Sequence, residues 1–268
     1  MNDSGSRQEL LVRESGIVAR GGILDPMSST TPPRRGSYGI DAPLLVPIPI
    51  FLAAANIVLG IVSRSIWPYL GAAAWLCMMG FALHASKRGK FIVWERVLDS
   101  LALRGDERIL DLGCGRGAVL LAVARRLPEG HAVGVDVWHK TDQSGNAADA
   151  TRFNAIAEGV SERVTLVTGD ARSLPFPNDH FDVIVSSLAL HNINGASERD
   201  RAIDEAVRVL KPGGRLLIAD LWGTRDYLRR LNELSMTHLN RRGLGWHVWW
   251  GGPWATTRMV EATKPGEI

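Results

Sequence analysis

The sequence predicts an α/β fold in which a doubly wound, mostly parallel sheet follows an apolar helical hairpin. Strand-like and helix-like segments alternate through residues 87–268, as they do in a parallel sheet with helices on both faces. Before them, residues 44–62 and 66–83 contain no charged side chain, and only a short turn separates the two runs. At 268 residues, the chain has room for one domain of ordinary size and this appendage.

The first predicted strand of the domain runs into a loop with glycine at every second position. The segment I-L-D-L-G-C-G-R-G places Asp111 near the strand end and Gly113, Gly115 and Gly117 in the turn. Glycine lets the backbone approach a small ligand at the carboxyl end of a strand, and an apolar helix is predicted next, at Ala118–Leu127. The same segment fits the dinucleotide fingerprint G-x-G-x-x-A, so the loop alone does not choose between nucleotide cofactors.

Four further strands are predicted, and the second and third strands of the domain each end in an acid. The four are expected at His131–Asp136, Val164–Asp170, Phe181–Ser187 and Arg215–Asp220. Apolar periodicity predicts helices at Lys90–Leu101, Ala118–Leu127, Ala147–Glu158, Glu198–Leu210 and Arg225–Met236. The segments L-P-F-P at 174–177 and L-K-P-G-G at 210–214 are predicted turns, and the second leads into the fifth strand.

The sequence resembles the class I S-adenosylmethionine-dependent methyltransferases, among them the type 11-like proteins. The resemblance rests on the D-x-G-x-G-x-G loop, the two strand-end acids and the two turns, which follow one another in this order. The resemblance covers roughly residues 95–265. It implies a Rossmann-like sheet of seven strands whose last strand is antiparallel, with the closing hairpin expected at His247–Trp250 and Thr256–Ala262. A nicotinamide-dependent enzyme is the alternative that the glycine loop leaves open.

The resemblance implies that the cofactor is S-adenosyl-L-methionine, held at the carboxyl ends of the strands. Asp111 is expected near the ammonium of its amino-acid end, Asp136 at the ribose hydroxyls and Asp170 at the adenine amino group. The alternative for these acids is a helix cap or a turn. The predicted cofactor-binding residues are Asp111, Gly113, Cys114, Gly115, Gly117, Asp136, Val137, Trp138, Asp170, Ala171 and Ser187. Either Val137 or Trp138 would cover the adenine ring, and the alternative role for Cys114 is that of a nucleophile.

Catalysis is expected to depend mainly on alignment, because the methyl group of a sulfonium is already activated. His191 is the predicted catalytic residue, since the segment after the fourth strand borders the transferable methyl in related enzymes and histidine titrates near neutrality. It would take a proton from a thiol, phenol or amine. The alternative is a histidine that shapes the pocket or caps the next helix. No metal site is predicted, because the histidines never stand with Cys, Asp or Glu at ligand spacing.

The two uncharged runs, Leu44–Val62 and Ile66–Leu83, are predicted to be transmembrane helices. Each would be about 27 Å long as a helix, close to the hydrocarbon thickness of a bilayer. Positive charges are denser at the outer ends of the hairpin than at its tip, where Arg64 stands, and this bias places the N-terminus and the catalytic domain on the cytoplasmic side. A hairpin packed on the domain, or a re-entrant one, is the alternative, because Pro47 and Pro49 disturb the first helix.

The predicted organisation is a disordered tail over residues 1–41, a transmembrane hairpin over 42–86 and a methyltransferase domain over 87–268. The tail is rich in Ser, Gly, Arg and Pro, a composition typical of disorder, and Met27 is an alternative start. Residues 38–43 either fold over the acceptor pocket or anchor the chain at the membrane. Four tryptophans near the carboxyl end could lie in that pocket, at the membrane interface or in the core. They are Trp246, Trp249, Trp250 and Trp254.

Composition narrows the function further. The net charge of +3 is mild and the arginines are dispersed, so nucleic-acid binding is not indicated, and two cysteines fit a reducing compartment. The polar loop at residues 138–146 either contacts the ribose or is a solvated connection. The leading hypothesis is a membrane-anchored methyltransferase that acts on a small hydrophobic acceptor, such as a lipid, a quinone-like ring or a lipophilic thiol. The alternative is a non-catalytic S-adenosylmethionine-binding membrane protein that acts as a sensor or scaffold.

Overall fold

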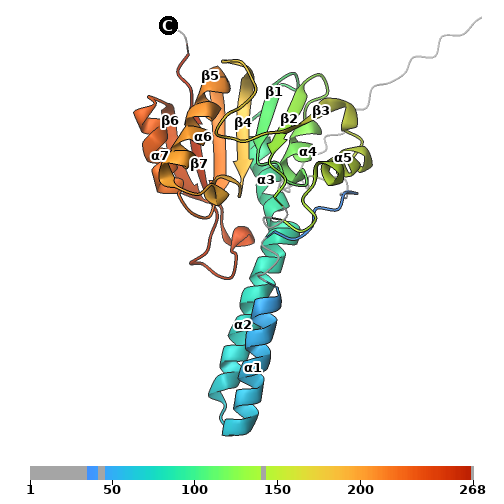
Figure 1. The fold of residues 1–268 in the computed structure, drawn as a ribbon, viewed down its shortest axis with the longest axis vertical. Coiled ribbons are helices and arrows are strands. Elements are labelled where there is room, and N and C mark those ends of the chain that lie inside the picture. Colours follow the sequence, from blue (N-terminus) through green and yellow to red (C-terminus); the bar gives the residue numbers. More distant parts are fainter. Residues whose placement is uncertain (1–34, 42–45, 140–142, 267–268) are drawn as a thin grey trace, which may run out of the picture. The chain divides into compact units, whose positions relative to one another are not determined.

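The computed structural model describes residues 35–41, 46–139 and 143–266 (Figure 1). The α-helices are α1 (Pro47–Ser63), α2 (Trp67–His84), α3 (Lys90–Ser100), α4 (Ala118–Ala124), α5 (Ala148–Ala157), α6 (Ala196–Val209) and α7 (Thr224–Glu233). The strands are β1 (Arg108–Leu112), β2 (His131–Asp136), β3 (Val164–Thr168), β4 (Phe181–Ser187), β5 (Leu210–Asp220), β6 (Thr237–Gly243) and β7 (Arg258–Thr263). A π-helix, η2 (Ala85–Gly89), joins α2 to α3, and the short 3-10 helices are η3 (Ser161–Arg163), η4 (Leu190–Asn192) and η5 (Trp246–Val248).

The seven strands form one sheet in the order β3-β2-β1-β4-β5-β7-β6. Strands β1 to β5 run parallel to one another, and β7 runs antiparallel to both β5 and β6. The predicted fold class is therefore confirmed, including the antiparallel last strand and the helical hairpin that precedes the sheet. The chain order reverses between β1 and β4, and open α/β sheets bind ligands at such a switch point, outside the carboxyl ends of the strands.

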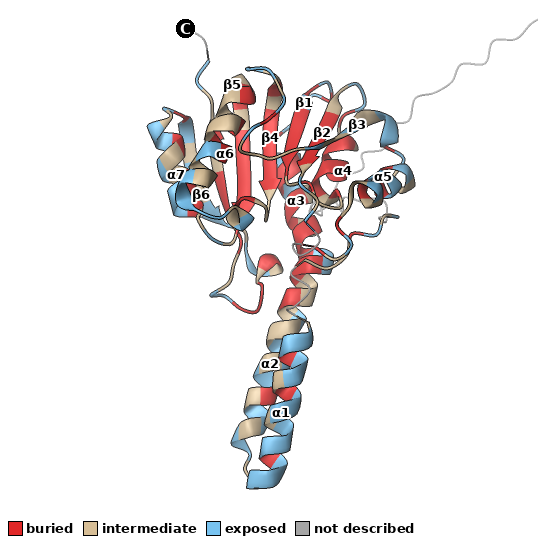
Figure 2. Cartoon of the chain, in the orientation of Figure 1, coloured by how far each residue is buried: buried red, intermediate tan, exposed pale blue. Residues whose placement is uncertain are grey.

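The sheet separates two hydrophobic cores, because successive residues of a strand point to opposite faces. In β1, Ile109 packs in one core with residues of α3 and α4, and Leu110 packs in the other with residues of α6 and α7. Figure 2 shows the central strands buried between these layers. Burial on both faces explains why the central strands have apolar sequences without polar alternation, and it holds their carboxyl ends rigidly in place for a site.

Helices α1 and α2 form the predicted hairpin. The chain reverses at Arg64, which adopts a left-handed φ of 51°, and α1 lies against α2. At Gly60, a Cβ would come within 2.7 Å of the Tyr69 ring, so the absence of a side chain lets the two helices approach closely. Many apolar side chains of the hairpin face outward (Figure 2), among them Phe51 at 73% and Val62 at 77% exposure.

Helix α2 does not end at the predicted domain boundary. It continues through η2 into α3, so that Trp67–Ser100 is one helix of 34 residues, about 51 Å long. Within the described part of the chain, only this helix has the length and apolar composition to cross a membrane, and 22% of its most apolar window is buried; α1 is apolar but shorter. A core helix of a soluble protein can have the same length and composition, so these two properties alone do not establish membrane attachment.

Two predictions about the carboxyl-terminal half are wrong in position. The first half of the strand predicted at His247–Trp250 belongs to the 3-10 helix η5, and Trp249 forms an isolated antiparallel bridge to Thr256. The strand that pairs with β7 is β6. Strand β6 lies at the edge of the sheet with mostly polar, exposed side chains, so it lacks an apolar alternation, whereas the aromatic run has high β-propensity. The segment L-K-P-G-G is not a separate turn but the irregularly paired start of β5.

Candidate active site

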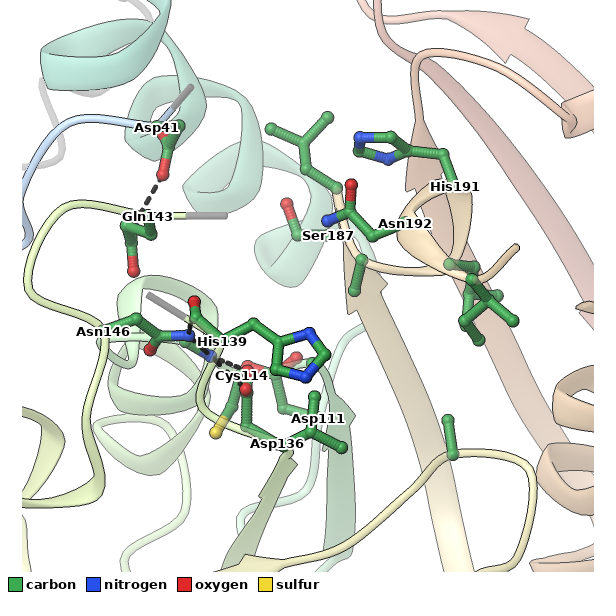
Figure 3. A pocket seen from close by; sticks show the side chains of 18 of the residues that line it. Asp41, Asp111, Cys114, Asp136, His139, Gln143, Asn146, Ser187, His191 and Asn192 are labelled. Carbon is green, nitrogen blue, oxygen red and sulfur yellow. Dashed lines mark hydrogen bonds between the residues drawn. The ribbon is translucent and has the colours of Figure 1, made fainter. Parts of the chain in front are cut away.

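A cavity of about 660 Å³ lies at the carboxyl ends of β1, β2 and β4. Its volume is within the range of small-molecule sites. Every predicted site residue except Gly117 and Trp138 lines it. Figure 3 shows Asp111 and Asp136 in one part of the cavity and His191 in another. The residues that the sequence predicts for the site therefore share a single cavity. Their separate roles follow from the burial and the hydrogen-bond partners of each side chain.

The glycine loop has the close contacts that its sequence predicts. Gly113 has a φ of +73°, and a Cβ there would lie 2.2 Å from the Cβ of Ala189 in the β4 loop. The backbone N–H of Gly115 donates to Oδ2 of Asp136 at 2.8 Å, which ties the loop to the end of β2. Gly117, with a φ of +83°, precedes the first residue of α4. Its role is thus to turn the chain into the helix, outside the cavity wall.

Asp111 lines the cavity without a protein partner. It is 2% exposed, and no described residue donates a hydrogen bond to either carboxylate oxygen. Burial, the largest cause, and the nearby charge of Asp136 together raise the pKa of Asp111 to about 8, against an opposing effect of the backbone N–H of Leu120. Burial and a neighbouring negative charge both disfavour the ionised carboxylate. A cation bound beside Asp111 would have the opposite effect on its pKa.

Asp136 is held in place by the backbone on both oxygens. Besides Gly115, it accepts from the backbone N–H of Trp138 at 2.6 Å. Asn146 reaches the same carboxylate with its Nδ2 at 3.5 Å, and its own buried Oδ1 receives no hydrogen bond from the residues that the structure describes. From the sequence, Asn146 is predicted only as part of a polar loop. The contact between Asn146 and Asp136 depends on how that loop folds back, which the sequence pattern does not show.

Asp170 has a protein partner that the sequence analysis did not identify. Its carboxylate accepts hydrogen bonds from the guanidinium of Arg172, with the shortest at 2.6 Å, and Arg172 also pairs with Glu198 of α6. The hydrogen bonds from Arg172 lower the pKa of Asp170, against a smaller opposing effect of burial. Asp170 is therefore ionised and paired with a protein side chain, whereas the carboxylate of Asp111 has no hydrogen-bond partner among the described residues.

Three further predicted residues have clear positions. Val137 lines the cavity, whereas the indole of Trp138 turns to β3 and donates from Nε1 to Thr168 at 2.9 Å. Cys114 lines the cavity as well, but burial, and then the charges of Asp111 and Asp136, hold the pKa of its thiol well above its usual range. A protonated thiol is a poor nucleophile, so the structure disfavours the nucleophilic role for Cys114.

His191 lies in η4 and lines the other part of the cavity. Its Nδ1 lies 2.5 Å from Oδ1 of Asp220, the last residue of β5, which is fully buried. The backbone N–H of His191 also donates to Oδ2 of Asp220 at 3.0 Å. The sequence analysis missed Asp220 as a site residue, although its position at a strand end was the feature that identified Asp136 and Asp170.

The four carboxyl-terminal tryptophans occupy different environments. Trp250 is buried and lines the cavity, while Trp249 packs on Phe81 of α2 with ring centroids 5.7 Å apart. Trp246 stacks on His84 at the end of α2, and Trp254 is exposed. The loop between β6 and β7 therefore contacts the base of the hairpin and also contributes to the cavity wall.

Residues 35–41, which the sequence analysis included in the disordered tail, hydrogen-bond to the domain. The Tyr38 hydroxyl donates to Glu158 of α5 at 2.7 Å. Asp41 accepts from Gln143 Nε2 at 2.6 Å (Figure 3) and from Lys90 Nζ, also at 2.6 Å. Asp41, Lys90 and Gln143 all line the cavity, so this segment contributes to its wall. Most of the predicted tail, and Met27 with it, lies outside the described residues, as do residues 42–45.

A family model described as "Methyltransferase domain" matches residues 110–218, the segment from β1 to β5 that carries the glycine loop, Asp136, Asp170 and His191. Residues 110–218 form a class I S-adenosylmethionine-dependent methyltransferase domain. The cofactor of this domain is S-adenosyl-L-methionine, as the family resemblance implies. The hairpin, Asp220 and Trp250 lie outside the matched segment.

Curated relatives match about half of the chain. The chain is 36% identical over 144 residues to a protein of Ruegeria sp. named ubiquinone/menaquinone biosynthesis C-methyltransferase UbiE, a match that covers 53% of this chain and 54% of the relative. The protein of the same name from Vibrio parahaemolyticus is 38% identical over 130 residues, 48% of this chain and 47% of the relative. The chain thus spans about half the length of the curated relatives it matches.

Solved structures resemble the methyltransferase domain in fold. The [4+2]-cyclase SpnF is 26% identical, with a TM-score of 0.52 over 65% of this chain and 81% of that chain. A SAM-dependent methyltransferase from Aquifex aeolicus is 18% identical, with a TM-score of 0.50 over 63% of this chain and 88% of the other. The second likeness concerns the fold alone. The name of the first indicates that this fold also supports a cyclisation, so the reaction has to be argued from the site.

Proposed function

We propose that the protein is a membrane-anchored S-adenosylmethionine-dependent methyltransferase that acts on a small hydrophobic acceptor, with a quinone-like ring as the first acceptor class to test. The observation that carries the proposal is the difference between the two parts of the methyltransferase cavity. One part offers the unpartnered carboxylate of Asp111 to a cation, and the other is walled by apolar and aromatic side chains beside His191. The names of the curated relatives support the quinone-like ring.

The cofactor part of the cavity fits a ligand that has positive charges and no phosphate. Asp111 would neutralise the ammonium or sulfonium of S-adenosylmethionine, since it is buried without a donor. Asp136 and Asn146 would accept from the ribose hydroxyls, and Val137 would lie on the adenine. The ligand would thereby supply the donors that the buried oxygens of Asp111 and Asn146 lack. When bound, the cofactor supplies an activated methyl group.

The acceptor part of the cavity has a wall that also contacts the hairpin. Trp222, Leu221 and Trp250 line it, and Trp222 stands edge-on to His191 with ring centroids 5.6 Å apart. Near Trp250, a Cβ at Gly251 would lie 3.4 Å from Met78 of α2. Because the same loop touches the cavity and α2, an acceptor with an apolar chain could place its ring near His191 and its chain along the hairpin.

Membrane attachment is proposed from the surface of the hairpin. Large apolar side chains are exposed along α1 and α2 (Figure 2), and a soluble protein rarely leaves so much contiguous apolar surface in water. They include Ile48, Ile50, Phe51, Ile57, Val58, Leu59, Ile61, Val62, Ile66, Trp67 and Leu70. Lys87 and Arg88 are exposed at the base of the hairpin, which supports a cytoplasmic position for the methyltransferase domain.

In this proposal, the chain contributes binding, alignment and proton transfer. The glycine loop and Asp111 fix the amino-acid end of the cofactor, and the apolar wall excludes water from the acceptor. His191 accepts the acceptor's proton at Nε2, which makes the acceptor a stronger nucleophile. The combined effect is an aligned, desolvated pair of reactants with a base beside one of them.

The test is turnover by the full chain in detergent or in vesicles. With radiolabelled S-adenosylmethionine and a short-chain hydroquinone, we expect transfer of label to the organic phase and formation of S-adenosylhomocysteine. Extracted lipids and lipophilic thiols are the parallel acceptors. Cofactor binding without turnover of any of these would contradict the enzyme proposal and favour a sensor or scaffold.

Membrane attachment is tested by fractionation of the full chain. We expect it to sediment with membranes and to resist carbonate and high salt, because apolar surface attaches it. Replacing Phe51, Val62 and Trp67 with asparagine should weaken this retention, and the matched control is replacement of Lys87 and Arg88 with glutamine, which should not. A wild-type chain that is freely soluble without detergent would contradict attachment and leave a hairpin that packs on protein.

A further inference from the structure

We propose that Asp220 is a positioning residue that holds His191 as the base in the acceptor part of the cavity, and that the acceptor is therefore a weak O–H acid. The inference rests on the proposed function and deepens it. It uses a carboxylate outside the segment that the family model matches. It also narrows the acceptor to groups such as a phenol or hydroquinone, because a nearby base accelerates their methylation far more than that of a group that is already ionised.

Asp220 is a buried carboxylate whose oxygens are both occupied by the protein. Oδ1 accepts from the backbone N–H of Leu221 at 2.8 Å, and Oδ2 accepts from the backbone N–H of His191 at 3.0 Å and from the Tyr227 hydroxyl at 3.2 Å. Asp220 has no exposed surface. It therefore cannot act as a ligand-binding acid in the way proposed for Asp111, and its remaining partner is the imidazole of His191.

The imidazole and the carboxylate are close enough for a direct interaction. Nδ1 of His191 lies 2.5 Å from Oδ1 of Asp220, although the two groups do not lie in line as a hydrogen bond requires. At this distance, rotation of the ring would let an Nδ1–H donate to Oδ1. That bond fixes the tautomer in which Nε2 carries the lone pair, and the side chain of His191 lines the cavity.

The surroundings of the pair favour the same arrangement. Tyr227 on α7 is fully buried, and burial together with the charge of Asp220 raises the pKa of its hydroxyl, so Tyr227 remains a donor to the carboxylate. Arg199 on α6 and Asp226 on α7 are the other charged groups that act on Tyr227. Arg199 donates to the backbone carbonyl of Ile193. Trp222 covers the edge of the imidazole. Asp220 thus stands as the negative partner of His191.

The proton balance is simple. The O–H bond of the acceptor breaks, its proton goes to Nε2 of His191, and the electron pair stays on the acceptor oxygen. That oxygen would then form a bond to the methyl group as the methyl–sulfur bond of the donor breaks, with the electron pair of the broken bond staying on sulfur, so that both products are neutral. The imidazolium is stabilised by Asp220 until it returns the proton to solvent. No further reactant is needed. Asp220 itself keeps its charge throughout, as the carboxylate partner of a catalytic histidine does.

The tautomer can be measured without activity. In the full chain labelled with ¹⁵N-histidine in detergent at pH 9, the spectrum of His191, identified by its loss in His191→Gln, should show a protonated Nδ1 and an unprotonated Nε2. Asp220→Asn should shift His191 toward a mixture of tautomers. Tyr227→Phe is the milder companion, which keeps the carboxylate and should keep the tautomer. The same tautomer in wild type and Asp220→Asn would overturn the inference.

Turnover gives the second readout, with a short-chain hydroquinone and its fluorinated analogue as probes. Asp220→Asn should lower kcat at pH 7 by about 10²-fold, with cofactor affinity unchanged within about twofold, and the deficit should shrink at pH 9 and with the more acidic fluorinated probe. A deficit equal at every pH and for both probes would reduce Asp220 to a structural role and overturn the inference. Absence of turnover in wild type would instead contradict the proposed function, while the tautomer measurement would still decide on Asp220.

Discussion

Asp111 and Asp220 are both buried carboxylates near the carboxyl ends of strands that flank β4, but their partners differ completely. Asp220 accepts three hydrogen bonds from the protein, whereas Asp111 accepts none from any described residue. A buried polar group without a partner destabilises a fold unless a ligand completes it. The comparison shows that an acid at a strand end can bind a ligand or can position another side chain, and that only its partners tell the two apart.

The largest expected effect follows from removing the charge at Asp111. Asp111→Asn keeps the shape of the side chain but cannot neutralise a cation, so affinity for S-adenosylmethionine at pH 8 should fall about 100-fold, or roughly 2.7 kcal/mol. Calorimetry on the full chain in detergent measures this. Asp220→Asn is the matched control and should change affinity by no more than about twofold. Equal losses in the two variants would remove the distinction between the acids.

A smaller loss is expected at Asp136, whose carboxylate also holds the glycine loop through Gly115. Asp136→Ala should weaken cofactor binding by about tenfold or more, or 1.4 kcal/mol. Asn146→Ala leaves the loop bond in place and should lose less, because Asn146 contributes a single acceptor at the ribose. Calorimetry that shows unchanged affinity in a folded Asp136→Ala variant would remove Asp136 from the cofactor site.

The smallest effect is expected at Asp170. Arg172 already occupies both oxygens of this carboxylate, and the pair is more than one third exposed, so a ligand gains little from it. Asp170→Asn should weaken cofactor binding by about threefold or less. If its loss in the same assay exceeded that of Asp136→Ala, the adenine would depend on Asp170 despite Arg172, and the ranking of the acids by their protein partners would be wrong.

The sequence predicted the parts of the molecule that depend on local pattern. Apolar runs predicted the central strands, and the spacing of glycines predicted the loop that packs on Ala189. Strand β6 was placed wrongly because an exposed edge strand needs no apolar residues. Contacts between residues far apart in sequence were not predictable, such as Asp41 with Lys90 and Gln143, because nothing local to a carboxylate specifies which distant donor will meet it.

Contacts between residues far apart in sequence also limit what could be predicted about the site. Asp111, Asp136 and Asp170 share one sequence pattern, yet the fold makes the first unpartnered, the second bound by backbone and the third paired with Arg172. Val137 and Trp138 are adjacent in the chain, but only Val137 lines the cavity. A pattern predicts where the side chains gather. Their partners and pKa values depend on burial and on the elements that pack around them.

The most direct test of the account is the pH dependence of cofactor affinity. Because the pKa of Asp111 is raised to about 8, the acid is mostly protonated at pH 7 and must release its proton when a cation binds. Between pH 5.5 and 7.5, below the usual pKa of the cofactor's amino group, calorimetry should show affinity rising up to about tenfold per pH unit in wild type and staying flat in Asp111→Asn. A wild-type affinity that is flat over this range would contradict the claim that Asp111 is the group that receives the cation.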